Sequence, residues 1–207
     1  MPSVADGIEL RPPAKRGDLS RAAREGARVI GLIDGVFDLT LAVTPAEVHD
    51  AAACGVELYG GASMGALRAC ECPQSMQGVG EIWAAYVAGD IRDDDEVAMT
   101  FMPGSYEVIA YPLVQVREVV RLAVELRPDL SRELDAFFHT VQARSFQERT
   151  MTAINDAAEP LVKLGLSREV LLQWMTLPEF DRKRRDAVQV LDVVTTARAT
   201  PPRPHSS

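Results

Sequence analysis

The sequence predicts an α/β protein with a small parallel sheet core, crossover helices and a helical C-terminal half. Two observations predict the sheet: residues 28–35 form a short apolar run that ends in Asp-Gly, and residues 56–69 read as a strand, a glycine-rich turn and a helix. A third predicts the helical half, because the chain from Pro112 onward has helical periodicity and no convincing strand. We expect an α/β core over residues 8–115, a helical region over 116–198 and a disordered tail over 199–207.

The composition is that of a globular protein and excludes several functional classes. The net charge of −8 over 207 residues argues against a general nucleic-acid binder, which needs a basic face. No apolar run approaches the ~20 residues that span a bilayer, and the first ten residues lack the pattern of a secretory signal. The three cysteines form no disulfide framework, so we expect a cytoplasmic protein with no nucleic-acid or membrane partner.

The first elements follow from local sequence signals. Residues 1–26 are polar and contain two adjacent prolines, which predicts an arm or a loop. The β-branched residues within 28–35 predict a buried strand. Thr44, Pro45 and Glu47 then predict a helix start, in which Thr44 caps the helix and Glu47 completes a capping box. That helix is expected to end near Gly55.

The second strand is predicted at residues 56–59, with a helix from Met64 onward. This order of strand, helix, strand and helix implies two parallel strands. Asp34 and Ser63 should therefore lie at the carboxyl ends of neighbouring strands, which is where ligands bind in open α/β sheets.

The rest of the chain is predicted to be helical. Leu113, Val116, Val120 and Val124 share one helix face. Further helices are expected over residues 79–87, 131–145, 147–164, 168–175 and 179–198.

The main candidate site is the turn at residues 61–65, which reads Gly-Ala-Ser-Met-Gly and matches the pattern G-x-S-x-G. Ser63 at a helix N-terminus could act as a nucleophile or hold an anion, with the N–H groups near Met64 and Gly65 stabilising an oxyanion. The alternative is that Gly61 and Gly65 only allow a tight turn and close helix–strand packing.

A nucleophilic serine needs a base, and none of the three histidines, at positions 49, 139 and 205, is clearly placed to act as one. Asp34 and Lys15 are the better candidates. Asp34 could equally cap its own turn. Lys15 and Arg16, with Arg68, could form a cationic wall around Ser63, or the first two could belong to a solvated arm.

Two other clusters invite interpretation. Residues 93–96 read Asp-Asp-Asp-Glu and could hold Mg²⁺, but such a run more often forms a solvated loop or a docking surface, so we expect it to be exposed and metal-free. Cys70 and Cys72 suggest sulfur transfer, yet their spacing is that of neither a zinc site nor a thioredoxin motif. No nucleotide-binding loop is present in the sequence, so no cofactor is expected.

Taken together, several segments resemble the TfuA-like family in order and spacing. These are residues 11–19 (RPPAKRGDL), 33–37 (IDGVF), 61–69 (GASMGALRA), 76–80 (MQGVG), 93–98 (DDDEVA) and 112–114 (PLV). The resemblance covers roughly residues 8–116. Relatives usually carry a further N-terminal strand and a Gly-Pro-Ser/Thr loop, and the given sequence starts shortly before the Arg-Pro-Pro segment. Residues 68–72 read Arg-Ala-Cys-Glu-Cys where the family has Arg-Ala-Ala-Glu-Leu.

The resemblance implies a role in peptide backbone thioamidation. TfuA-like proteins act beside YcaO enzymes, which use ATP to activate a backbone amide of a precursor peptide. The TfuA-like partner is thought to release or deliver sulfur from a thiocarboxylated ThiS-like carrier. The expected function is therefore either a hydrolase-like reaction at Ser63 or that of a non-catalytic adaptor, which binds and activates YcaO and recruits the carrier.

Overall fold

The computed structural model describes residues 7–37, 41–102, 104–105 and 107–199. Within these residues the chain divides into two compact units. The first comprises residues up to Asp90 together with those from Asp186 onward, and the second is Ile91–Arg185. The expected disordered tail falls, except for Ala199, outside the described residues.

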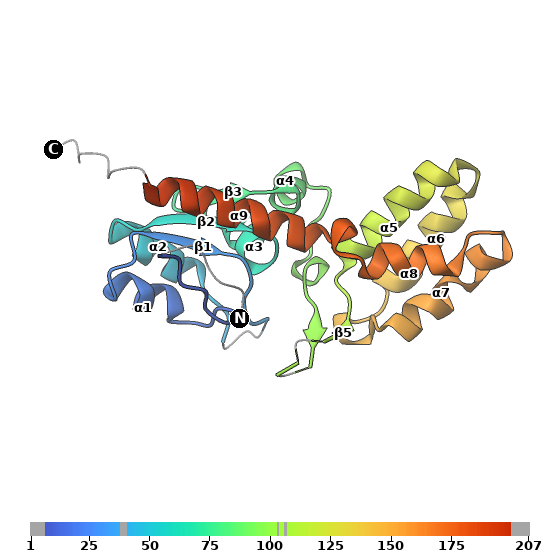
Figure 1. Ribbon diagram of the computed structural model, residues 1–207, viewed down its shortest axis with the longest axis horizontal. Coiled ribbons are helices and arrows are strands. Elements are labelled where there is room, and N and C mark those ends of the chain that lie inside the picture. Colours follow the sequence, from blue (N-terminus) through green and yellow to red (C-terminus); the bar gives the residue numbers. More distant parts are fainter. Residues whose placement is uncertain (1–6, 38–40, 103, 106, 200–207) are drawn as a thin grey trace. The chain divides into compact units, whose positions relative to one another are not determined.

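The first unit is built on a three-stranded parallel sheet in the order β1-β2-β3 (Figure 1). Its elements in chain order are α1 (Asp18–Arg24), β1 (Val29–Leu32), α2 (Pro45–Ala53), β2 (Glu57–Gly61), α3 (Met64–Glu71), β3 (Gln77–Val79) and α4 (Glu81–Ala88). The predicted parallel pair is confirmed, with Leu32 opposite Gly60 in the register. The fold is thus the expected α/β core.

Glycines allow helices to approach both faces of this sheet. A Cβ on Gly60 would lie 2.2 Å from the carbonyl oxygen of Gly65 in α3. On the other face, a Cβ on Gly31 would lie 2.9 Å from Val190, a residue of α9 (Arg182–Ala199). The sheet is therefore sandwiched between α3 and the part of α9 that belongs to the first unit (Figure 1).

The first helix is a feature that the sequence interpretation missed. We expected an arm or loop up to residue 26, yet α1 begins at Asp18, directly after Gly17 at φ 92°. The helix forms because Leu19 and Ala22 are buried, and because the Glu47 carboxylate accepts hydrogen bonds from the backbone N–H groups of Gly17 and Leu19. Only one of the two hydrogen bonds of the expected capping box at α2 is therefore seen among the described residues. The Thr44 hydroxyl accepts from the Glu47 N–H at 3.2 Å, whereas the Glu47 carboxylate accepts from the Leu19 N–H of α1.

The second unit is mostly helical, as expected for the C-terminal half. It contains a short antiparallel pair, β4 (Thr100–Phe101) and β5 (Val108–Ala110), which we did not predict. Its helices are α5 (Leu113–Leu126), α6 (Ser131–Gln142), α7 (Met151–Lys163) and α8 (Arg168–Thr176), with single-turn 3₁₀ helices η1 (Asp94–Glu96), η2 (Pro128–Leu130), η3 (Phe146–Glu148) and η4 (Pro178–Phe180). The predicted helices are confirmed with shifted ends, and Leu113 and Val116 belong to the buried core. Within the described part of the chain, no helix is long and apolar enough to span a membrane.

Candidate functional site

The candidate site is the turn that joins β2 to α3. Ser63 is the N-cap residue of α3, and its side chain makes no capping hydrogen bond to that helix. The preceding residue, Ala62, has φ 66° and is the non-glycine residue with positive φ among those described. A left-handed backbone at a residue with a Cβ stores strain, and such strain concentrates at functional sites.

The turn contacts the end of β1 directly. The carbonyl oxygen of Ile33 accepts hydrogen bonds from the backbone N–H groups of Ser63 at 3.2 Å and Gly65 at 3.3 Å. Asp34, which follows Ile33, is half-buried, and its carboxylate accepts from the N–H of Gly35 at 3.0 Å. The structure therefore brings the Asp34 and Ser63 segments together, and Asp34 also caps its own turn.

Ser63 is fully buried, with 0% of its surface exposed. In addition, the N–H groups of Ser63 and Gly65 already donate to Ile33. The Gly65 N–H is therefore engaged within the fold and is not directed at a bound oxyanion in this conformation.

The arm before α1 passes beside this turn. Ala14 forms an isolated parallel bridge with Gly35: its N–H donates to the Asp34 carbonyl, and its carbonyl accepts from the Val36 N–H, both at 3.0 Å. A Cβ on Gly35 would lie 2.9 Å from Met64 Cγ. The arm, the end of β1 and the start of α3 therefore meet at one point.

Lys15 and Arg16 follow Ala14 directly, and both are exposed. The backbone N–H of Lys15 donates to the Asp18 carboxylate at 2.8 Å, and that of Arg16 donates to the Leu41 carbonyl at 2.7 Å. The two cations are thus held on an ordered stretch of backbone next to the Ser63 turn.

Arg68 is directed to other groups. Its Nε donates to the Val43 carbonyl at 2.6 Å, and its guanidinium forms an ion pair with Glu71 at 2.6 Å. Only 12% of its side chain is exposed. In this conformation Arg68 fastens the segment before α2 to α3.

Close packing accounts for the two glycines of the turn. A Cβ on Gly61 would lie 2.5 Å from the Val79 carbonyl oxygen, and one on Gly65 would lie 1.7 Å from the Leu32 carbonyl oxygen. The packing interpretation of these glycines is therefore sufficient without a ligand, whereas the strained Ala62 and the buried Ser63 are not explained by it.

A family model described as "TfuA-like protein" matches residues 34–150. The chain belongs to the TfuA-like family. No curated protein matches the sequence. The matched range includes Asp34 and the whole Ser63 turn and continues through α6 to Thr150, the N-cap residue of α7, whereas the arm that carries Lys15 and Arg16 precedes it.

The acidic segment of this TfuA-like chain matches our expectation of an exposed loop at Asp93 and Asp94 but not at Glu96. Glu96 is 1% exposed and pairs with Arg117 at 2.6 Å, and Arg117 also lies over the ring of Phe138. Asp95 pairs with the buried Arg149 at 2.5 Å. Each pair stabilises one buried charge of the second unit, Glu96 in the first and Arg149 in the second, because a buried charge requires a partner. Among the described residues, no cluster of three or more His, Cys, Asp or Glu could hold a metal ion.

Two further features, a buried thiol and a surface pair, bear on the search for a nucleophile. Cys72 is fully buried, and burial raises the pKa of its thiol, which lowers the fraction of reactive thiolate. On the surface, the Nδ1 atom of His49 lies 2.7 Å from the Oγ atom of Ser75, a pair that was not predicted from the sequence. No sequence motif connects these two residues, which are 26 positions apart.

Proposed function

We propose that this TfuA-like protein serves peptide backbone thioamidation beside a YcaO-family enzyme, by releasing sulfur from the C-terminal thiocarboxylate of a ThiS-like carrier. The observation that carries the proposal is the meeting of three segments at the carboxyl edge of the sheet. These are the strained turn that holds Ser63, the Asp34 loop and the cationic arm. The reaction class comes from the resemblance to the TfuA-like family. The three segments suit an anionic acyl substrate because they place a serine and two cations at the same edge of the sheet.

The proposed reaction has two steps. The hydroxyl oxygen of Ser63 bonds to the thiocarboxylate carbon, the C–S bond breaks, and the hydroxyl proton leaves with the sulfur as hydrosulfide. Water then hydrolyses the acyl-serine, which returns the serine hydroxyl and leaves the carrier with a carboxylate and one released proton. Asp34 or Lys15 would accept and donate the proton in both steps.

Binding of the carrier would use the positive charge next to the turn. Lys15 and Arg16 would contact the thiocarboxylate tail, with Arg68 as a more distant cation. Backbone N–H groups around Gly61, Met64 and Gly65 would approach the developing oxyanion. Because Ser63 is fully buried, the attack requires the turn to open when the carrier binds.

A second function within the same pathway is a non-catalytic adaptor that binds the YcaO enzyme and recruits the carrier and the precursor peptide. The burial of Ser63 favours it, as does the use of the Ser63 and Gly65 N–H groups by Ile33. In this function the turn and the arm bind the carrier tail without cleaving it. For either function we propose a cytoplasmic setting, in which the three thiols stay reduced.

The deciding experiment measures sulfide release from a thiocarboxylated ThiS-like carrier by the purified protein, without YcaO or ATP. Ser63→Ala should lower the rate by two orders of magnitude or more, as loss of a nucleophile does. Ser75→Ala is the matched control, because that serine lies beside a histidine and follows the C-terminal end of α3, whereas Ser63 caps its N-terminal end. Release that persists in Ser63→Ala would exclude Ser63 as the nucleophile. A wild-type protein that binds both YcaO and the carrier but releases no sulfide would support the adaptor.

A further inference from the structure

Glu47 ties the arm and α1 to α2 through a buried carboxylate. Only 6% of the residue is exposed. Its Oε2 accepts from the Gly17 N–H at 2.9 Å, and its Oε1 accepts from the N–H groups of Leu19 at 2.8 Å and Ser20 at 3.4 Å. Residues some thirty positions apart are thereby joined by one side chain.

This contact satisfies a need that α1 does not meet by itself. The first N–H groups of a helix have no partner within the helix. The N-cap residue of α1 is Gly17, which has no side chain to supply one. Glu47 therefore fixes both the start of α1 and the direction from which the arm enters it.

The arm is also held at its other end. Ala14 is bridged to Gly35 beside the Ser63 turn. Lys15 and Arg16 occupy the short stretch between this bridge and the Glu47 anchor at Gly17. A stretch of two residues fixed at both ends has little freedom, so the anchor sets where the two cations lie relative to the turn.

We propose that Glu47 is a positioning residue that holds Lys15 and Arg16 in place for the anionic C-terminal tail of the carrier. The inference rests on the proposed function, because it takes the carrier tail as the ligand of the arm. Glu47 acts through backbone contacts with the arm and does not itself touch the substrate.

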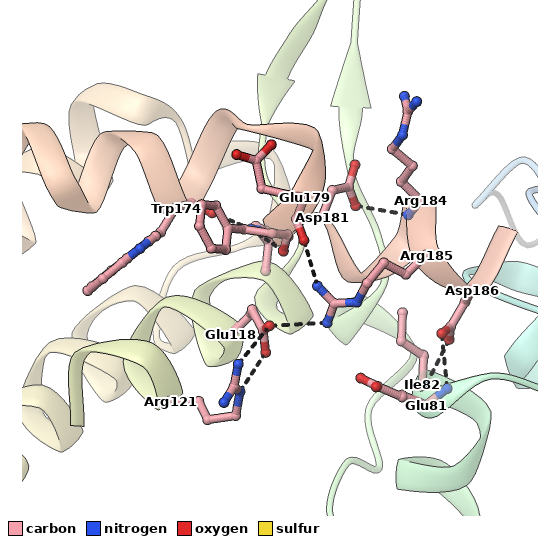
Figure 2. Close-up of polar contacts among 12 residues, drawn as sticks. Glu81, Ile82, Glu118, Arg121, Trp174, Glu179, Asp181, Arg184, Arg185 and Asp186 are labelled. Carbon is pink, nitrogen blue, oxygen red and sulfur yellow. Dashed lines mark hydrogen bonds and ion pairs between the residues drawn. The ribbon is translucent and has the colours of Figure 1, made fainter. Parts of the chain in front are cut away.

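Asp186 offers a matched control for the loss of a buried helix-capping carboxylate. It is 1% exposed and accepts from the N–H groups of Glu81 at 3.0 Å and Ile82 at 2.8 Å, at the start of α4 (Figure 2). It belongs to the same unit as Glu47 and has the same chemistry, but it caps α4 and not α1. Asp186→Asn should therefore lower stability as Glu47→Gln does and leave the arm in place.

The test compares the affinity of Glu47→Gln and Asp186→Asn for the thiocarboxylated carrier in the full-length protein. Glu47→Gln should bind about tenfold more weakly, because the two cations no longer share one position. Asp186→Asn should stay within about twofold of the wild type. If the protein releases sulfide with Asp34 as the base, Glu47→Gln should raise KM and leave kcat unchanged, whereas with Lys15 as the base it should also lower kcat.

A double-mutant cycle then asks whether Glu47 acts through the arm. In a protein that already carries Lys15→Glu and Arg16→Glu, adding Glu47→Gln should weaken carrier binding no further. Asp18→Asn provides a second variant in case Glu47→Gln fails to fold. It removes the carboxylate that accepts the Lys15 N–H, at a position that is a quarter exposed, so it should weaken binding in the same direction.

Hydrogen exchange reports whether the loss of the Glu47 carboxylate loosens the start of α1. Amides at the start of α1 should exchange faster in Glu47→Gln and not in Asp186→Asn. A wild-type protein that does not bind the carrier would overturn the proposed function, and with it the ligand of the arm. A wild type that binds, with equal losses in the two single variants or additive losses in the cycle, would overturn only the role of Glu47.

Discussion

Gly65 lies so close to Leu32 that a Cβ on residue 65 would be 1.7 Å from the Leu32 carbonyl oxygen. The obstacle is backbone and not the end of a flexible side chain, so it cannot rotate away. This approach brings the first turn of α3 against the end of β1 and allows the Gly65 N–H to reach the carbonyl of Ile33. The geometry of the Ser63 turn therefore depends on the absence of a side chain at position 65.

Gly65→Ala should lower the free energy of unfolding of the first unit by about 3 kcal/mol or more, since helix and strand must move apart. Gly55→Ala is the control: it has φ 83° but open space around it, so it should cost about 1 kcal/mol from backbone strain alone. Urea unfolding followed by Trp83 fluorescence, in a Trp174→Phe background, reports on this unit. Equal losses in the two variants would contradict the close approach.

Ala62 offers a test of strain at the turn. Replacing it with glycine keeps the left-handed conformation but removes its cost of ~1–2 kcal/mol. The change also deletes a buried methyl group worth ~0.8 kcal/mol and increases the conformational freedom of the unfolded chain. These effects nearly cancel, so Ala62→Gly should change stability by less than about 1 kcal/mol.

Ala66→Gly is the matched variant, because Ala66 is equally buried but lies inside α3. It should cost about 2 kcal/mol, from helix propensity plus the lost methyl. The same urea titration measures both changes. A loss at position 62 as large as that at position 66 would mean that the turn holds no strain.

The sheet and most helices could be predicted because their signals are local. The apolar run at residues 28–35, the Thr44-Pro45 helix start and the strand–turn–helix around Ser63 each depend on neighbouring residues. Elements that depend on distant partners were missed. The helix α1 needs the carboxylate of Glu47, and β3 spans three residues that, in the described part of the chain, pair with β2.

The candidate site was predictable in its location but not in its detail. Parallel strands bring Asp34 and Ser63 to one edge whatever their side chains do. The burial of Ser63 and the contact of Arg68 with the Val43 carbonyl are set by packing between segments, which no spacing in the sequence encodes. The end of the acidic run was misjudged for the same reason: the partners of Glu96 and Asp95, which are Arg117 and Arg149, come from other elements.

The second unit contains a buried carboxylate with two cationic partners. Glu118 is 4% exposed and accepts hydrogen bonds from Arg121 at 2.9 Å and Arg185 at 3.1 Å (Figure 2). Burial alone would raise the pKa of Glu118, but the two guanidinium groups outweigh it and hold the pKa below its ordinary value of 4.5. A carboxyl with a lowered pKa in the folded state stabilises the fold above its unfolded pKa, and this contribution is lost as pH falls through the folded pKa.

Glu118→Gln should therefore lower the stability of the second unit by about 1–3 kcal/mol at pH 7 and reduce its loss of stability at acid pH. The control is Glu125→Gln: Glu125 also pairs with Arg121, but 63% of its side chain is exposed. That change should stay within about 0.5 kcal/mol. Unfolding followed by Trp174 fluorescence from pH 3 to 8, in a Trp83→Phe background, measures both. A Glu118→Gln profile parallel to the wild type would exclude the ion pairs as the source of the pH dependence.

The arm carries positive charge in an acidic chain. Lys15 and Arg16 are exposed beside the Ser63 turn, in a chain whose net charge is −8. The start of α3 supplies only about half a unit of positive charge, and Arg68 is directed to Val43 and Glu71. An anionic carrier tail would therefore depend on the two arm cations for its attraction to this edge of the sheet.

Reversing both charges, with Lys15→Glu and Arg16→Glu, should weaken carrier binding by tenfold or more at low salt, and less at high salt as screening grows. The control should change net charge equally and disturb no contact. The adjacent cations Lys183 and Arg184 of α9 are unsuitable as this control, because the Lys183 ammonium donates to the Val97 carbonyl at 3.0 Å. Arg24 and Arg28 are better: both are exposed, and Arg28 precedes β1, at the opposite end of that strand from Asp34. The measurement is the carrier affinity of the two double variants at two salt concentrations. Equal losses of affinity would show that net charge causes the effect and that the arm is not part of the binding site.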